Sequence, residues 1–406
     1  MSARTSLRAF LASARSALVA PAAQRKSPLT LVVGNESAAD DTGPDLDSLC
    51  SAVIYAYLRT TNPPHNLHIP ISNLPRDDLK LRPEMTAALA HADLKPADLL
   101  TLDDILPSLP ADDTRWVLVD HNALTGALSK RFASRVVGCV DHHADEGVVP
   151  TDTAEEPRVV EKCGSCASLV VEYCRQAWEA AAVKGVEGKE EDAQLARLAL
   201  APILIDTTNL QSKDKTTPKD ISAVQFLEKI AGAKFDRDAF FNEISAVKED
   251  ISSLGFRDIF RKDYKQWDDQ GSGPKPAVMG VSAVVQNLEY LLSKADGDHG
   301  VLLEEFRKWA AERELDIGVI MTTAHPDGKF QRQLFIWAFN RNAVEVCKNF
   351  VKGWKDDLGL ESWGEGRLDQ VGEDEWRMAW SQGNIRHSRK QVAPMLREAI
   401  KGEPRL

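Results

Sequence analysis

The chain has 406 residues, enough for two domains with sizeable hydrophobic cores. Its hydrophobic content of 43% and charged content of 27% are ordinary for a soluble globular protein, and no apolar run approaches the roughly 18 residues that a membrane-spanning helix needs. A formal net charge of -11 argues against general binding to nucleic acids or anionic membranes. It does not exclude a polyanionic substrate, because a local basic groove with a metal ion can override the net field.

Residues 1–28 are basic and contain no acidic residue, a composition that resembles a mitochondrial transit peptide. Their apolar residues nevertheless recur at helical spacing, at Leu7, Phe10, Leu11, Ala14 and Leu18. We favour an ordinary N-terminal helix and expect a cytoplasmic protein, with a mitochondrial location as the alternative.

Six cysteines without an even, short-range framework favour a reducing intracellular compartment. Cys163-Gly164-Ser165-Cys166 has the spacing of a redox motif, but it lies where a loop is expected to enter a helix. We interpret its cysteines as small packing residues.

Four apolar segments stop abruptly at residues that can bind a metal. They cover 29–33, 116–119, 135–140 and 201–205, and the residues that follow them include Asn35, Asp120, Asp141-His142-His143 and Asp206. A β-branched run with such an end predicts a buried parallel strand, and open α/β sheets bind their ligands at the carboxyl edge of the strands. The fourth segment also continues a helix expected from Glu191 to near Asp206. The recurrence favours one shared metal site over a lone histidine pair satisfied within the core.

Further elements of the first domain follow from local signals. A helix is expected from Asp45 or Asp47 to about Arg59, and the two aspartates can serve both as caps and as metal ligands. Short strands are expected near 68–71 and 159–160, and an amphipathic helix over 165–182. Thr217-Pro218-Lys219-Asp220 predicts a helix start, and that helix should close the domain near residue 233.

Beyond this point the alternation of strands with ligand-bearing ends is lost. Helices are expected around 236–252 and 254–263, a strand near 277–285, and paired strands over 315–323 and 333–340 joined by a turn at 325–328. The run 388–394 predicts the start of the last helix. The predicted fold class is α/β: a doubly wound, mainly parallel sheet over 1–235, and a smaller α+β domain over 236–406, with the active site in the cleft between them.

The candidate ligands are carboxylates and one imidazole, with no obvious thiolate: Asp45, Asp47, Asp120, Asp206 and His142. This donor set suits Mg²⁺ or Mn²⁺ rather than a structural zinc. Four acids in one site repel one another, and two cations bridged by one carboxylate are the usual solution. The expected chemistry is metal-assisted hydrolysis of a phosphate ester or anhydride.

The combined motifs resemble the DHH phosphoesterase superfamily. They are Asn35, Asp45-x-Asp47-Ser48, Asp120-His121-Asn122, Asp141-His142-His143 and Asp206-Thr207-Thr208. The run Ser388–Pro394 is similar to the DHH-associated C-terminal domain of family II pyrophosphatases, Prune-like proteins and fungal exopolyphosphatases, and the fungal exopolyphosphatase branch is the best match. The resemblance spans roughly residues 29–395.

The resemblance implies a role for each matched position. Asp45 and Asp120 would hold one ion with Asn35 as a third ligand. Asp47, Asp120, His142 and Asp206 would hold the other, so that Asp120 bridges the pair. His143 would face the substrate phosphate, and three cations of the second domain would reach the phosphates: Lys265, Arg389 and Lys390. The implied catalytic set is Asp120, His143, Arg389 and Lys390.

Two departures from the family pattern bear on metal and substrate. Asn35 stands where the pyrophosphatases have a histidine; an amide is a harder donor, which favours Mg²⁺ over softer ions such as Co²⁺ and makes pyrophosphate the less suitable substrate. Nine residues also lie between Asn35 and Asp45, against three in the family motif. Asp40 and Asp41 are therefore competing ligands, which we rank below Asp45 and Asp47.

The leading functional hypothesis is an exopolyphosphatase that releases terminal orthophosphate from inorganic polyphosphate. The alternatives are an inorganic pyrophosphatase or a Prune-like nucleotide phosphodiesterase, and, from a different class, a non-catalytic interaction protein with a decayed site. We expect a monomer that binds two divalent cations and polyphosphate, but neither nucleic acid nor membranes.

Overall fold

The computed structural model describes residues 5–25, 28–35, 46–153, 155–182, 188–271 and 276–402. The chain forms two compact units, and the division falls between Lys248 and Glu249. Helix α8 (Arg237–Glu249) thus lies almost wholly in the first unit, so the structural division comes later than the boundary expected at 235. No helix in these ranges is long and apolar enough to cross a membrane.

The first unit is built on a five-stranded sheet in the order β2-β1-β3-β4-β5, in which every pairing is parallel. Its strands are β1 (Leu29–Val33), β2 (His68–Ile71), β3 (Thr114–Val119), β4 (Val136–Asp141) and β5 (Arg158–Val160). All five residues of β1 are buried, as expected for a parallel sheet covered on both faces. The predicted parallel sheet is confirmed.

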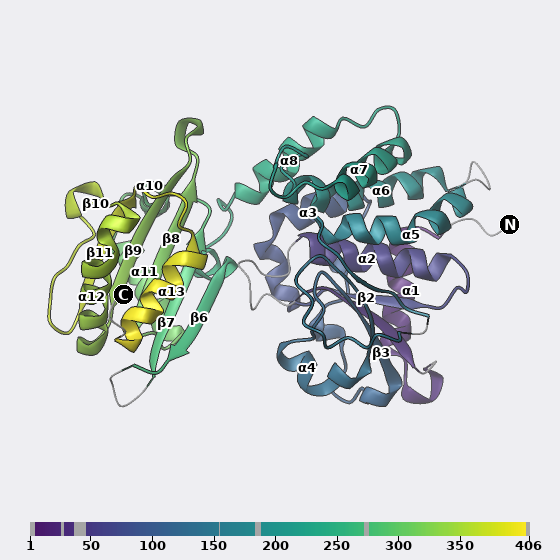
Figure 1. Ribbon diagram of the computed structural model, residues 1–406, viewed down its shortest axis with the longest axis horizontal. Helices are drawn as coiled ribbons and strands as arrows, with labels where there is room; N and C mark the ends of the chain where they lie inside the picture. Colours follow the sequence, from purple (N-terminus) through teal and green to yellow (C-terminus); the bar gives the residue numbers. More distant parts are fainter. Residues whose placement is uncertain are drawn as a thin grey trace. The chain divides into compact units, whose positions relative to one another are not determined.

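Helices of the first unit cover this sheet. They are α1 (Leu7–Val19), α2 (Leu46–Thr61), α3 (Pro83–Ala90), α4 (Gly126–Phe132), α5 (Cys166–Ala182), α6 (Lys189–Asp206) and α7 (Pro218–Ala231). Helices α2, α5, α6 and α7 pack together in one layer, and α4 lies on the other side of the sheet (Figure 1). The five predicted apolar positions of α1 are all buried, which confirms the N-terminal helix.

The apolar segment 201–205 is helical. It forms the last turns of α6, which ends at Asp206. The helix expected from Glu191 is confirmed, and a fourth strand with a ligand at its end is not formed. Asp206 is therefore positioned by a helix terminus, whereas Asn35, Asp120 and the two histidines follow strands of the sheet.

The strand order also sets where a ligand can bind. From β1 the chain crosses to β2 on one side, and from β3 it crosses to β4 on the other, so the crevice between the carboxyl ends of β1 and β3 is a topological switch point. Gly34 lets the end of β1 approach α2 closely, because a Cβ there would lie 2.7 Å from the Cβ of Ser48. Asn35 and Asp120 follow these two strands.

The second unit contains a six-stranded sheet in the order β10-β11-β9-β8-β7-β6. Its strands are β6 (Tyr264–Asp269), β7 (Ala277–Val284), β8 (Ile317–Ala324), β9 (Gln331–Ala338), β10 (Leu360–Ser362) and β11 (Trp376–Gln382). Only the β7–β8 pairing is parallel. The predicted pairing of β8 with β9 is confirmed.

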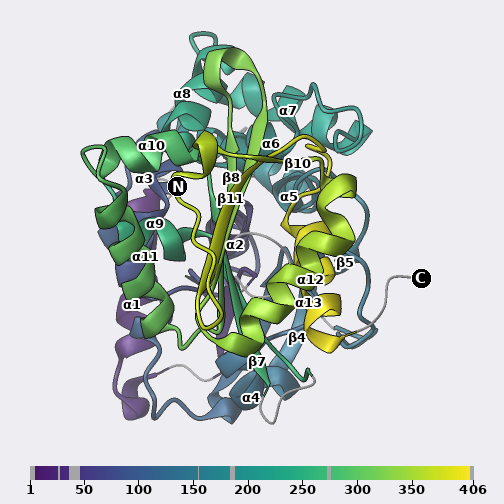
Figure 2. The ribbon, with the colours of Figure 1, turned by 90° about the vertical axis from the view of Figure 1, so that its left-hand side faces the viewer.

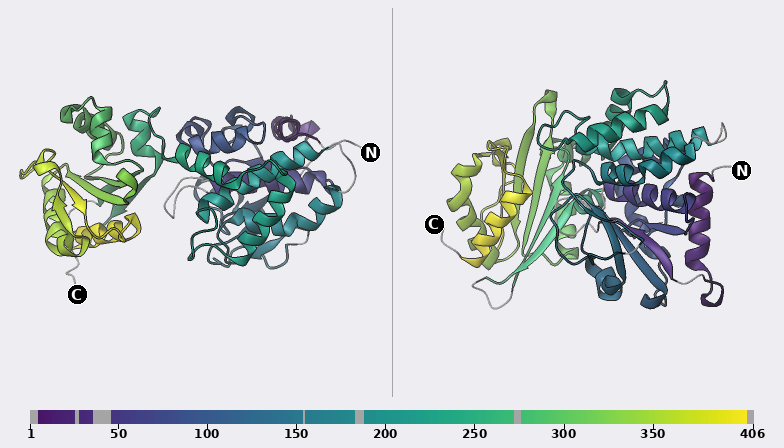
Figure 3. Two further views of the ribbon diagram at one scale, coloured as in Figure 1. Left: turned by 90° about the horizontal axis from the view of Figure 1, so that it is seen from above. Right: turned by 45° about the vertical axis from the view of Figure 1, so that its right-hand side comes forward.

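Helices lie on both faces of this second sheet. They are α9 (Phe256–Lys262), α10 (Leu288–Lys294), α11 (His299–Glu312), α12 (Arg341–Leu358) and α13 (Arg389–Lys401). Figure 2 shows α12 and α13 on one side of the strands and α9, α10 and α11 on the other. The yellow helix α13 lies against the sheet in both views of Figure 3. The second unit is therefore α+β, as predicted.

Candidate metal centre

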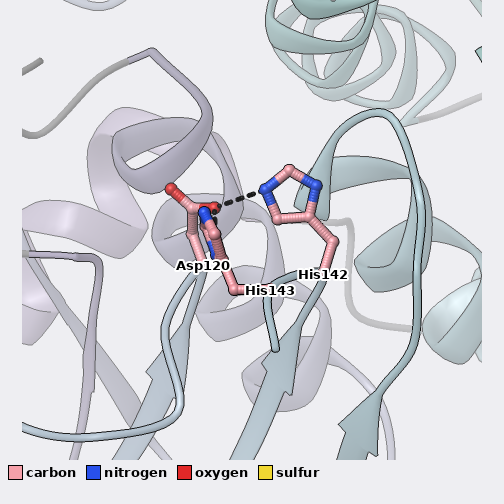
Figure 4. Close-up of side chains that lie close together, drawn as sticks. All are labelled: Asp120, His142 and His143. Carbon is pink, nitrogen blue, oxygen red and sulfur yellow. Dashed lines mark ion pairs between the residues drawn. The ribbon is translucent and has the colours of Figure 1, made fainter. Parts of the chain in front are cut away.

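Three predicted site residues come together at the carboxyl ends of β3 and β4. Asp120 follows β3, and His142 and His143 follow β4 (Figure 4). One ligand atom from each lies within 4.8 Å of those of the other two. Oδ1 of Asp120 is 3.1 Å from Nε2 of His142 and 3.9 Å from Nδ1 of His143. A carboxylate and two imidazoles at this spacing could hold a metal ion.

Asp120 has an unusual backbone conformation. Its φ is +64°, a left-handed value that side chains other than glycine rarely adopt. The conformation is stabilised on both sides, because the backbone N–H donates to the Val140 carbonyl at 3.0 Å and Oδ2 accepts from the Ser48 hydroxyl at 2.6 Å. Strain of this kind is concentrated at functional sites. The Ser48 contact also leaves Oδ1 as the oxygen that faces the histidines.

The orientation of His142 indicates a site for positive charge between its Nε2 and the Asp120 carboxylate. Its Nδ1 is 3.0 Å from the Cys163 carbonyl, which can only accept, so Nδ1 carries a proton and Nε2 faces Asp120. Two acceptors 3.1 Å apart would repel unless a proton or a cation lies between them. Burial lowers the pKa of His142, but the hydrogen bond to Asp120 and the charges of Asp47 and Asp120 outweigh it and raise the pKa to about 10. The donor set therefore fits a divalent cation.

His143 is oriented by a second carboxylate. Its Nδ1 is 2.8 Å from Oδ1 of Asp141, a fully buried residue that also accepts from the side chain of Asn122. The hydrogen bond to Asp141 raises the pKa of His143 despite partial burial. The His143 side chain is 44% exposed, the most exposed of the three. It is the member of the cluster best placed to exchange a proton with a bound molecule.

Asp47 is not a member of this three-residue cluster, as judged among the residues that the structure describes. It is 2% exposed, and its carboxylate accepts from the backbone N–H groups of Cys166 and Ala167 at 2.6 and 2.9 Å. It therefore caps the N-terminus of α5. Its charge is one of those that raise the pKa of His142. The cap was expected at the start of the helix that carries Asp47, whereas the structure places its carboxylate at the start of another helix, α5. Its role as a metal ligand stays a prediction.

The other predicted ligands are placed to different degrees. The backbone N–H of Asn35 donates to the Ser48 hydroxyl at 3.1 Å, and the same hydroxyl donates to the Asp120 carboxylate. Ser48 therefore connects Asn35 to Asp120. Asp206 ends α6 and precedes three successive left-handed residues, 208–210, with φ of 52°, 54° and 64°. Asp45, and its competitors Asp40 and Asp41, lie outside the described residues.

One of the three predicted phosphate-binding cations of the second unit, Arg389, pairs with Asp263. Arg389, the first residue of α13, is 4% exposed and lies 2.7 Å from a carboxylate oxygen of Asp263. Lys265 is half-buried on β6, and Lys390 is exposed. Ser388 and Gln391 form a capping box at the start of α13. Part of the 388–394 motif thus has a local structural reason, and Asp263 is a partner that sequence reasoning missed.

All six cysteines are free and buried. Burial raises the pKa of Cys163 to about 11 and that of Cys166 well above its ordinary value. Their thiolates are therefore scarce at neutral pH, which favours the packing interpretation over a redox motif.

Comparisons with known proteins match both units. The family model described as "DHH family, N-terminal domain" matches residues 39–203, and the model described as "DHHA2 domain" matches residues 242–399. The first covers β3, β4 and the two histidines but begins after β1 and Asn35, and the second covers the segment with Lys265, Arg389 and Lys390.

Three curated relatives represent the similar sequences. A Schizosaccharomyces pombe protein named "Putative exopolyphosphatase" is 32% identical over 92% of this chain and 91% of its own length. Human "Exopolyphosphatase PRUNE1" is 28% identical over 96% of this chain and 79% of its own. A "Manganese-dependent inorganic pyrophosphatase" of Methanothrix thermoacetophila is 27% identical over 72% of this chain and 80% of its own.

Proposed function

The chain belongs to the DHH family, and from that membership we propose that it is a metal-dependent exopolyphosphatase, which hydrolyses terminal phosphoanhydride bonds of inorganic polyphosphate and releases orthophosphate. The single observation that carries the proposal is the Asp120–His142 pair: a buried carboxylate 3.1 Å from an imidazole whose other nitrogen is fixed by a carbonyl. Within this family, such a pair is suited to a divalent cation and hence to phosphoryl chemistry.

We assign the ligands of two divalent cations, Mg²⁺ or Mn²⁺, to two sets that share Asp120. The first set is Asn35, Asp45 and Asp120, and the second is Asp47, Asp120, His142 and Asp206. When bound, the two cations would lower the pKa of a water molecule and neutralise phosphoryl oxygens. The Ser48 hydroxyl holds the bridging carboxylate of Asp120 in place for both.

The remaining proposed roles belong to side chains that face the substrate. His143, fixed by Asp141 through Nδ1, can exchange a proton with the phosphate through its other ring nitrogen. Lys265, Arg389 and Lys390 would bind phosphate oxygens, where their charge stabilises the anionic transition state. We propose a cytoplasmic monomer that binds neither nucleic acid nor membranes.

Pyrophosphate hydrolysis is a second candidate activity. The archaeal manganese-dependent pyrophosphatase relative favours it, whereas the amide of Asn35, in place of the pyrophosphatase histidine, favours polyphosphate. A Prune-like nucleotide phosphodiesterase activity and a non-catalytic role are the other readings that the experiment must separate.

A hydrolysis assay across substrates and metals tests the proposal, with orthophosphate release measured for the phosphoanhydrides and AMP formation measured for cyclic AMP. Pyrophosphate, tripolyphosphate, long-chain polyphosphate and cyclic AMP are each presented with Mg²⁺, Mn²⁺ or Co²⁺. We expect orthophosphate release from tripolyphosphate and long polyphosphate to exceed release from pyrophosphate, and cyclic AMP to be unaffected. Preferred cleavage of pyrophosphate or cyclic AMP would assign one of the alternative enzymes, and no turnover with any metal would favour the non-catalytic protein.

A further inference from the structure

One buried carboxylate outside the metal-binding motifs accepts six hydrogen bonds. Asp220, on α7, is fully buried, and each of its two oxygens has three donors within 3.3 Å. The donors are Sγ of Cys163, the N–H of Gly164 and of Ser165, Oγ of Ser168, and the N–H and Oγ1 of Thr217. Four of the six come from the segment 163–168, the end of the loop before α5 together with the first turn of that helix, which we call the α5 entry loop. Asp220 therefore fixes this loop against the start of α7.

The α5 entry loop touches two of the proposed metal ligands directly. The carbonyl of Cys163 accepts from Nδ1 of His142 at 3.0 Å and so determines which ring nitrogen faces Asp120. The N–H groups of Cys166 and Ala167 donate to the two carboxylate oxygens of Asp47. A shift of this loop would therefore move an imidazole and a carboxylate together.

The same loop packs beside a third proposed ligand. A Cβ at Gly164 would lie 2.8 Å from the methyl carbon of Thr207, the residue after Asp206, and 2.7 Å from Oδ2 of Asp220. Only a residue without a side chain fits between α7 and the end of α6 at this point. The position of the loop is thus coupled to the helix terminus that carries Asp206.

We infer that Asp220 is a positioning residue for one of the two metal ions. The α5 entry loop bonds to Asp47 and His142 and packs against the residue that follows Asp206. All three ligands belong to the second of the two proposed ligand sets. The first set shares only Asp120 with it. The inference rests on the proposed function, and it adds that loss of Asp220 weakens one ion selectively.

The chemistry of the site makes Asp220→Asn a sharp perturbation. A carboxylate can accept on both oxygens, whereas an amide presents an NH₂ group on one side. In place of Oδ2 that NH₂ would face the N–H groups of Gly164 and Thr217, and two donors that face each other must move apart. Asp192→Asn is the matched control, because Asp192 is also a buried aspartate of the first unit but accepts from Trp178, away from the entry loop.

The test is calorimetric titration of metal-free protein with Mn²⁺, with thermal unfolding measured in parallel with and without Mn²⁺. Wild type and Asp192→Asn should bind two ions alike. Asp220→Asn should bind one ion with wild-type affinity and the other at least tenfold more weakly than wild type does. Mn²⁺ should therefore raise the Tm of Asp220→Asn by less than it raises the Tm of wild type. Equal weakening of both ions, or two wild-type sites in Asp220→Asn, would overturn the inference. A wild type that fails to bind two ions would instead overturn the proposed function, and this inference with it.

Milder variants keep the test decisive if Asp220→Asn does not fold. Ser168→Ala removes one of the six donors and leaves the carboxylate in place. Gly164→Ala forces the loop away from Thr207 and Asp220. Each variant should weaken binding of the same one of the two Mn²⁺ ions, Gly164→Ala more than Ser168→Ala. If both variants bind both ions with wild-type affinity, Asp220 is only a structural cap.

Discussion

Nη2 of Arg389 lies 2.7 Å from Oδ1 of Asp263, and the same guanidinium donates through Nη1 to the Asp263 carbonyl at 3.2 Å. The two residues belong to the second unit, and the arginine is almost fully buried. The pair holds the guanidinium in one orientation before any substrate arrives, which reduces the entropy lost when a phosphate binds. A guanidinium presents its donors in a planar fork, a geometry that matches phosphate oxygens.

Arg389→Ala should lower turnover of polyphosphate at least tenfold, which corresponds to about 1.4 kcal/mol of transition-state stabilisation. Mn²⁺ affinity should not change, because Arg389 ligates no ion in the proposed scheme. Arg389→Lys should rescue the activity only in part, since an ammonium cannot reproduce the planar fork. The measurements are steady-state kinetics and metal titration.

Arg397→Ala is the matched control for Arg389→Ala. Arg397 lies on the same helix, α13, and also pairs with an aspartate of the second unit, contacting both carboxylate oxygens of Asp269. Its loss should cost stability without lowering turnover. If both variants lose activity equally, or if Arg389→Ala turns over like wild type, Arg389 does not bind the substrate.

Asn35→His should shift metal preference towards Mn²⁺ and Co²⁺ and raise cleavage of pyrophosphate relative to polyphosphate. An imidazole is a softer ligand than an amide. The contact that ties Asn35 to Ser48 uses its backbone N–H, so the substitution retains it. Activity profiles with Mg²⁺, Mn²⁺ and Co²⁺ for both substrates provide the measurement, and an unchanged profile would place Asn35 outside the metal centre.

Sequence reasoning reached the parts of the site that follow strands. The β-branched runs before Asp120 and His142 predict parallel strands, and parallel strands bring their carboxyl ends to one edge whatever lies between them in the chain. The capping pattern at Thr217 likewise located the start of α7. These signals are local in the sequence, so they can be recognised without knowledge of tertiary contacts.

The interactions that sequence missed depend on residues brought together only by folding. The Ser48–Asp120, Asp263–Arg389 and Asp220–Gly164 contacts join residues from separate elements, and no periodicity predicts such pairs. Strands β6, β10 and β11 were not predicted either. β10 has only three residues, and β6 and β11 carry exposed polar residues, so their apolar signal is weak.

Glu156 should make the first unit sensitive to acid. Hydrogen bonds from His68 and Tyr55 and the charge of Arg59 outweigh the effect of burial and lower the pKa of Glu156 from 4.5 to about 2. Because the folded-state pKa is the lower one, the contribution is complete above pH 4.5 and is lost as the pH falls from 4.5 towards 2. It amounts to at most about 3 kcal/mol.

Denaturant unfolding of wild type and Glu156→Gln at several pH values measures this contribution. The difference in unfolding free energy between the two proteins should be largest near pH 7 and should shrink below pH 4.5. Glu155→Gln, a change at the exposed neighbour, is the control and should follow wild type. A pH-independent difference between wild type and Glu156→Gln would contradict the prediction.

Asp120→Ala should abolish phosphate release and two-ion binding together while the protein stays folded. The carboxylate of Asp120 is the only ligand shared by both proposed sets, so its loss leaves neither complete. Removing it also removes the acceptor that faces Nε2 of His142 at 3.1 Å, the contact that draws a cation to this position.

The backbone at Asp120 calls for a second substitution beside alanine. With φ at +64°, alanine is more strained than aspartate or asparagine, whose short polar side chains tolerate the left-handed region, and asparagine can still accept from Ser48. Asp120→Asn therefore separates the lost charge from any backbone movement. Calorimetric titration with Mn²⁺ should show fewer than two ions in both variants, with a thermal transition retained in each. Two tight sites in Asp120→Asn would mean that the bridging ligand is another carboxylate, and the first candidates would then be Asp47 and Asp206.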